Sequence, residues 1–256
     1  MRIGQYVPMA AFADDIARHL DSVAEERQRR AASSSLLVKV TALKAFQQRR
    51  FSHTYADLLA SSRYGPAARY FLDELYGPKD FSARDAQFAR VAPSVARVFP
   101  SEVAGTLAVL GELHALSETL DTAMSEALSS PRIRPRDYIA AWHAVGRVDD
   151  RSRQIDLTLA IASQLDRITR LPLLRNALRL MRGPARAAGL EDLQRSLETG
   201  FDTFKAMKGA DEFIAFIGER ERALAATLFA ARGGRGGDAA KDQALAALPP
   251  TDSDAA

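Results

Sequence analysis

One predicted helix carries the residues whose spacing is best suited to chemistry. In the stretch GELHALSETLD, His114 is followed one turn later by Glu118 and two turns later by Asp121. A histidine with carboxylates on neighbouring turns can act as a general base with an orienting acid, or can supply metal ligands. The same pattern is typical of a hydrogen-bonded polar layer inside a helical bundle. His114, Glu118 and Asp121 are therefore candidate catalytic residues, and both interpretations stay open.

Residue types argue against most other catalytic chemistry. The chain has no cysteine, which excludes disulfides, thiolate nucleophiles, iron–sulfur clusters and the usual structural zinc sites. Carboxylate di-iron bundles use Glu-x-x-His pairs, and none of the four histidines belongs to one. The GxSxG, Walker and GxGxxG motifs are also missing. We therefore expect no cofactor and no metal.

Two further histidines have a structural and a functional interpretation. Trp142 and His143 are adjacent, and together they could line a ligand pocket or bind haem. Packing of Trp142 in the core, with His143 at its boundary, is the simpler interpretation. His19 falls on the apolar stripe of the first predicted helix, so we expect it to be a hydrogen-bonded core histidine.

The elements that must position these residues are helices. Helical periodicity recurs from end to end, and the alternating pattern of strands is absent. We therefore expect an all-α protein, with one bundle-like domain of about nine to ten helices over residues 1–232. Capping and helix-starting residues such as Ser33 and Pro135 separate the predicted helices. From residue 233 on, the sequence is poor in aromatic and branched residues, so we expect residues 233–256 to form a disordered, low-complexity tail.

A second candidate region follows a short predicted helix that starts at Pro66. Aromatic and acidic residues are interleaved in YFLDELYGPKDF, and helical phase places Phe71 toward the core while Tyr70 and Asp73 point away from it. Such a short aromatic helix needs tertiary packing to be stable. The junction after this helix carries four further pocket candidates, which are Tyr76, Asp80, Arg84 and Asp85.

The stretch YFLDELY also resembles the signature of a family of uncharacterised bacterial proteins named for the motif FFLEELY. The segments LPLLRNALRLMRGPARAAGL and GFDTFKAMKGADEFIAFIGERERAL are similar to the same family, so the resemblance extends over most of residues 36–229. The departures, Tyr70 for phenylalanine and Asp73 for glutamate, are conservative. The resemblance implies a single domain, and it carries no catalytic residue, cofactor or partner over to this chain.

Composition and charge limit the class of function. Hydrophobic residues make up 47% and charged residues 26%, as in soluble globular proteins, and no apolar run is long enough to span a membrane. The N-terminus lacks an apolar leader, so we expect a cytoplasmic protein. The net charge of +3 is spread along the chain, which disfavours nucleic acid as a partner.

Two hypotheses about function follow from these observations. The first is a non-enzymatic binding or scaffolding module that binds an unknown protein partner or associates with itself. The alternative is an enzyme or small-ligand-binding protein with a polar pocket around His114, Glu118 and Asp121.

Overall fold

The computed structural model describes residues 9–74, 86–88, 90–91, 101–171, 173–231 and 237–250. Within these residues all regular secondary structure is helical, which confirms the all-α prediction. The helices are α1 (Met9–Ala31), α2 (Ser34–Thr54), α3 (Ala56–Ala60), α4 (Gly65–Glu74), α6 (Ser101–Ala127), α7 (Pro135–Val145), α8 (Val148–Thr169), α9 (Leu174–Leu180), α10 (Arg182–Ala187), α11 (Glu191–Ala206), α12 (Asp211–Ala230) and α13 (Gly237–Ala246).

Local sequence signals explain where several of these helices start and end. Ser33 caps α2, because its hydroxyl accepts a hydrogen bond from the Leu36 backbone N–H at 3.3 Å. Pro135 is the first residue of α7, where its missing N–H costs nothing. The helices outnumber the nine to ten expected. One reason is a break at Tyr55, which separates α2 from α3.

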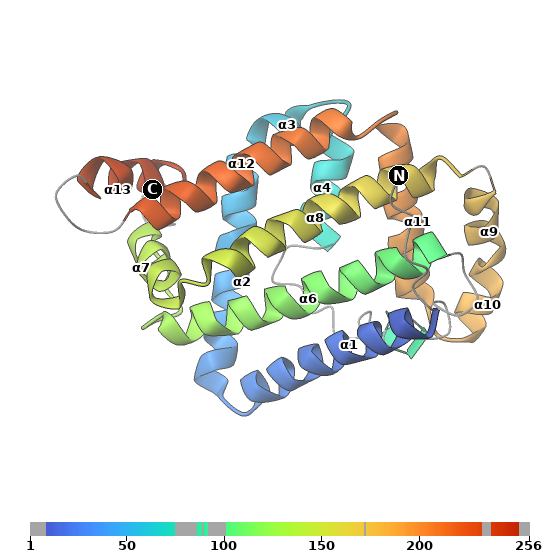
Figure 1. Cartoon of the computed structure of the whole chain (residues 1–256), viewed down its shortest axis with the longest axis horizontal. Helices are drawn as coiled ribbons and strands as arrows, with labels where there is room; N and C mark the ends of the chain where they lie inside the picture. Colours follow the sequence, from blue (N-terminus) through green and yellow to red (C-terminus); the bar gives the residue numbers. More distant parts are fainter. Residues whose placement is uncertain are drawn as a thin grey trace, which may run out of the picture.

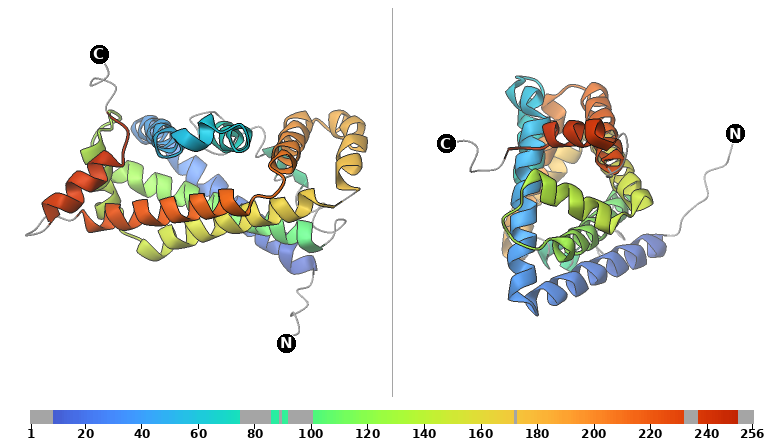
Figure 2. Two further views of the ribbon diagram at one scale, coloured as in Figure 1. Left: turned by 90° about the horizontal axis from the view of Figure 1, so that it is seen from above. Right: turned by 90° about the vertical axis from the view of Figure 1, so that its left-hand side faces the viewer.

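The long helices form two layers. α1, α6, α8 and α12 lie side by side in one layer (Figure 1). α2, α4 and α11 run across this layer on one side (Figure 2). The crossing of α2 over α6 matters most for the predicted site, because it brings the polar residues of α2 against the middle of α6.

Apolar side chains between the helices form three clusters. One joins α2, α6, α7, α12 and α13 around Phe46 and Trp142. A second joins α2, α3, α4, α8, α11 and α12 around Tyr55 and Phe71. The third is smaller and lies between α1 and α6 around Ile16. The polar side chains of the predicted site lie between these clusters.

Part of the predicted tail is helical, which differs from our expectation of disorder from residue 233 on. Residues Gly237–Ala246 form α13, which packs against α12 and α7 (Figure 1). Ala244 and Leu248 are buried in the cluster that contains Trp142. They lie one turn apart and so share a face of the chain. The average composition of the tail hides this short apolar stripe.

The YFLDELY motif is structural as far as it is described. Phe71 is buried, and its ring packs on Phe204 of α11 and Phe213 of α12, with centroids 5.8 and 6.1 Å away. Tyr70, predicted to point away from the core, instead lies against α11 and donates a hydrogen bond to the Ser196 carbonyl at 3.1 Å. The four pocket candidates of the junction lie outside the described residues: Tyr76, Asp80, Arg84 and Asp85.

Candidate functional site

The predicted carboxylates of α6 are held in a buried network of ion pairs. Glu118 is buried and pairs with Arg30 of α1, and it also pairs with Lys44 of α2 at 2.6 Å. Arg30 is itself buried, and its Nε donates to the Thr122 hydroxyl at 2.9 Å. Asp121 accepts a hydrogen bond from the Gln47 amide at 3.0 Å. Three helices therefore meet in one polar layer.

The two carboxylates of this layer differ in their electrostatics. Burial alone would raise the pKa of Glu118, but the cations of Lys44 and Arg30 outweigh it and hold the pKa at about 2. Burial raises the pKa of Asp121, and Lys44 only partly opposes that rise. Glu118 is thus a fixed anion in its ion pairs at neutral pH, whereas Asp121 is shifted toward its protonated form.

This geometry matches the polar-layer interpretation of the α6 stripe. Oxygens of both carboxylates are occupied by side chains of α1 and α2. Charge on His114 lowers the pKa of Glu118 further, so the two groups do interact. None of the three residues lines the cavity described below. Among the described residues, no three histidine, aspartate or glutamate side chains gather as a metal site.

Trp142 packs in the core. Its ring is buried between Tyr138 and Phe229, and the Arg151 guanidinium lies 4.2 Å from the ring centroid. His143 is half-buried, and neither of its ring nitrogens has a hydrogen-bond partner in the described part of the chain. Neither residue lines the cavity described next.

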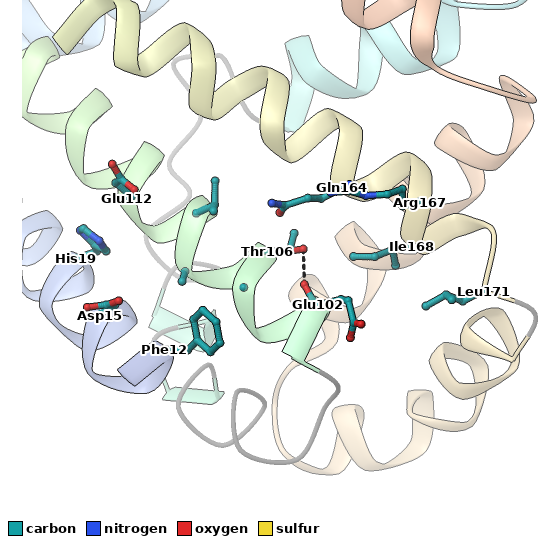
Figure 3. Close-up of a pocket in the computed structure, with 13 residues that line it drawn as sticks. Phe12, Asp15, His19, Glu102, Thr106, Glu112, Gln164, Arg167, Ile168 and Leu171 are labelled. Carbon is teal, nitrogen blue, oxygen red and sulfur yellow. Dashed lines mark hydrogen bonds between the residues drawn. The ribbon is translucent and has the colours of Figure 1, made fainter. Parts of the chain in front are cut away.

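A cavity of about 470 Å³ opens at the other end of α6 (Figure 3). It lies between the first turns of α1, the start of α6 and the end of α8. Most of the surface that lines it is apolar and belongs to residues such as Phe12, Val109, Ile168 and Leu171, although charged and polar side chains also reach it. The size falls in the range of small-molecule pockets. Sequence patterns did not reveal this cavity, because it forms where three helices distant in the chain come together.

Polar residues of the cavity come from the same three helices. His19, which we expected in the core, is half-buried and lines the cavity. The Gln164 side chain reaches from α8 toward α6 (Figure 3), and its Oε1 is buried with no hydrogen-bond partner among the described residues. Leaving such an acceptor unpaired costs about 1–3 kcal/mol. A bound ligand that donates a hydrogen bond to Gln164 would remove this cost.

A second unusual surface lies on the helix α9, which exposes apolar side chains on one face. Leu174 and Leu178 are half-buried, but Leu173 just before the helix is 76% exposed and Leu180 at its end is 79% exposed. Ala177 lies between them on the same face, at spacings of four and three residues. Arg175, in contrast, points inward, and its side chain is only 18% exposed. An ordinary surface helix buries leucine and exposes arginine.

Ion pairs and hydrogen bonds join α9 and α10 to α11. Glu198 of α11 is buried and binds Arg182, with one contact at 2.7 Å, and Arg175 at 3.3 Å. The Gln194 amide donates to the Leu178 carbonyl at 2.6 Å. The hydrogen bond from Arg182 is the main reason why the pKa of Glu198 is held at about 2. This carboxylate draws Arg175 inward, whereas Arg182 binds it from an exposed position.

We call the outward side chains of Leu173, Ala177, Leu180 and Met181 the α9 face. All four are exposed, and so is Arg179, which directly precedes Leu180 in the chain. The sequence held a signal for this surface that motif searches miss. Residues 167–190 contain six arginines and no acidic residue, and leucines alternate with the arginines.

Comparison with known proteins gives a family and no activity. The fold and the sites define an all-α domain with a buried polar layer, a cavity and an exposed apolar helix face. The chain belongs to the DUF8198 family, a domain of unknown function, which matches residues 26–234. Neither the curated proteins nor the solved structures gave a match. Among the described residues, no helix is long and apolar enough to span a bilayer.

Proposed function

We propose that this chain is a non-enzymatic protein-interaction module of the bacterial cytoplasm that binds its partner through the α9 face. The observation that supports this most is the exposed apolar surface of α9, with Leu173 and Leu180 exposed while Arg175 is turned inward. Exposed apolar surface of this kind is unfavourable in water and is typical of binding surfaces.

The chemistry of the α9 face favours an amphipathic helix with carboxylates as the partner. An apolar helix face packs against exposed leucines in the way that helical peptides dock on apolar surfaces. Arg179 is exposed beside the leucines, and no described residue forms an ion pair with it. A partner carboxylate would give this guanidinium a charge-assisted hydrogen bond.

The same surface is poorly suited to two other occupants. Binding to an anionic membrane requires free basic residues around the apolar face. Here Arg170, Arg175, Arg182 and Arg186 are already paired with carboxylates of the chain. A second copy of the chain would present the same arginine-rich surface, and its residues 167–190 contain no carboxylate to pair with Arg179.

Two designed helical peptides test this function. They share one leucine face and differ only in their polar residues, which are glutamate in one and lysine in the other. In an anisotropy titration, we expect the full chain to bind the glutamate peptide more tightly than the lysine peptide. The double variant Leu173→Ser, Leu180→Ser should bind the glutamate peptide at least about tenfold more weakly, because both apolar anchors are lost.

The matched control is Val38→Ser, which changes an exposed apolar residue on α2, a helix that lies away from α9 (Figure 1). It should bind like the unmodified chain. Equal affinity for the two peptides, equal losses in the control and the double variant, or binding only to anionic vesicles would each overturn the proposal.

A further inference from the structure

We infer that the cavity between α1, α6 and α8 is a binding site for a small, uncharged, mainly apolar molecule that carries a hydrogen-bond donor. The site is separate from the α9 face and from the polar layer around Glu118. The inference depends on the shape of the cavity, on its apolar walls and on the unpaired acceptor of Gln164.

The shape of the cavity depends on a glycine in its wall. Gly105 lines the cavity, and a Cβ atom placed there would lie 3.9 Å from the ring of Phe12, at ordinary contact distance. The position therefore accepts alanine, whereas a longer side chain has to extend past Phe12 into the open space. Ile168 and Leu171 supply apolar surface on the opposite side, from α8 and the residues after it (Figure 3).

Four charged residues line the cavity, which are Asp15, Glu102, Glu112 and Arg167. Arg167 is exposed to solvent, so water can hydrate its charge without a ligand. Asp15 pairs with Arg18, and Glu112 binds Arg153 through two hydrogen bonds of 2.7 and 2.8 Å. These carboxylates are neutralised by the chain itself and do not call for a cationic ligand. The buried Oε1 of Gln164, in contrast, has no donor among the described residues. A ligand N–H or O–H would satisfy it after a small turn of the amide.

The probe for this site is N-phenylnaphthylamine, an uncharged aromatic amine with one N–H whose fluorescence rises in apolar surroundings. Titrated with the full chain, it should bind saturably at one site. Gly105→Met should weaken binding by about tenfold or more, because its side chain occupies the cavity. Gly105→Ala is the matched control and should bind within about threefold of the unmodified chain.

Two further variants keep the test decisive even if Gly105→Met does not fold. Gln164→Leu should weaken binding of the amine but not of phenylnaphthalene, which has no donor and is measured by displacement. Leu180→Ser, on the α9 face, should leave amine binding unchanged. The inference is overturned if the unmodified chain shows no saturable binding, if Gly105→Met binds as tightly as Gly105→Ala, or if Leu180→Ser abolishes the signal.

Discussion

At the scale of residues, a buried ion pair lies in the middle of the molecule. Arg30 of α1 and Glu118 of α6 are 88 positions apart in the sequence, and both are buried where they form their ion pair. Two buried charges are stable together because each removes the cost of burying the other, and removing one leaves the other uncompensated. We therefore assign Glu118 a role in holding α1 and α2 on α6.

Glu118→Gln should lower the free energy of unfolding at pH 7 by about 3–5 kcal/mol, because Arg30 is left buried without a carboxylate. Glu118 has a folded-state pKa of about 2 against an ordinary value of 4.5. Its contribution is therefore complete above pH 4.5 and is lost as the pH falls toward 2. Urea unfolding of both chains at pH 7 and pH 3 should show the difference shrinking at the lower pH.

Glu112→Gln is the matched control for that measurement. Glu112 lies on α6, as Glu118 does, and its substitution breaks a partly exposed ion pair with Arg153 of α8. It should cost no more than about 1 kcal/mol. Equal losses for the two variants, or a Glu118→Gln loss that does not change with pH, would contradict this account of the polar layer.

The sequence predicted the α6 stripe but not its partners. The spacing of His114, Glu118 and Asp121 places them on neighbouring turns whatever the fold is. Nothing in the spacing links them to Arg30, Lys44 or Gln47, because those contacts depend on how α1 and α2 cross α6. The choice between a catalytic group and a polar layer therefore depends on tertiary contacts that the sequence does not reveal.

At the scale of elements, one close contact sets the distance between α4 and α11. A Cβ atom at Gly200 of α11 would lie 2.7 Å from the hydroxyl oxygen of Tyr70 and 2.9 Å from its ring. Such distances are too short for any carbon, so the glycine lets Tyr70 reach the Ser196 carbonyl. The YFLDELY motif thus joins two helices through both Phe71 and Tyr70.

Gly200→Ala should destabilise the chain by about 1–3 kcal/mol through overpacking, although alanine is the better helix former. Gly105→Ala in α6 is the control, because its added Cβ lies 3.9 Å from the Phe12 ring, at ordinary contact distance, and its stability should stay equal or rise by up to about 1 kcal/mol. Thermal unfolding of both variants measures this difference. If Gly200→Ala is as stable as Gly105→Ala, the packing of α4 on α11 differs from this account.

Helix positions were easier to predict than helix orientation. Capping and helix-starting residues such as Ser33 and Pro135 act locally, so their positions are read directly from sequence. Periodicity shows which residues share a face, but it does not show which face is buried. On α9, Leu174 and Leu178 are half-buried, but Arg175 is turned inward as well because Glu198 of α11 binds it, while Leu180 stays exposed.

At the scale of the whole molecule, the two proposed binding sites lie near each other and have different chemistry. The cavity lies beside the C-terminal end of α8, and α9 follows directly in the chain (Figures 1 and 3). Leu171 lines the cavity and is also partly exposed, two residues before Leu173 of the α9 face. One end of the molecule thus carries the features that suit binding, while the apolar clusters and the polar layer stabilise the rest.

The central claim, that the α9 face binds an acidic amphipathic helix, is tested most directly by reversing one charge. In the peptide titration, Arg179→Glu should weaken binding of the glutamate peptide by about threefold to tenfold and strengthen binding of the lysine peptide, at low salt. The variant should fold normally, because Arg179 is exposed. Unchanged affinities for both peptides, or tighter binding of the glutamate peptide, would contradict the claim.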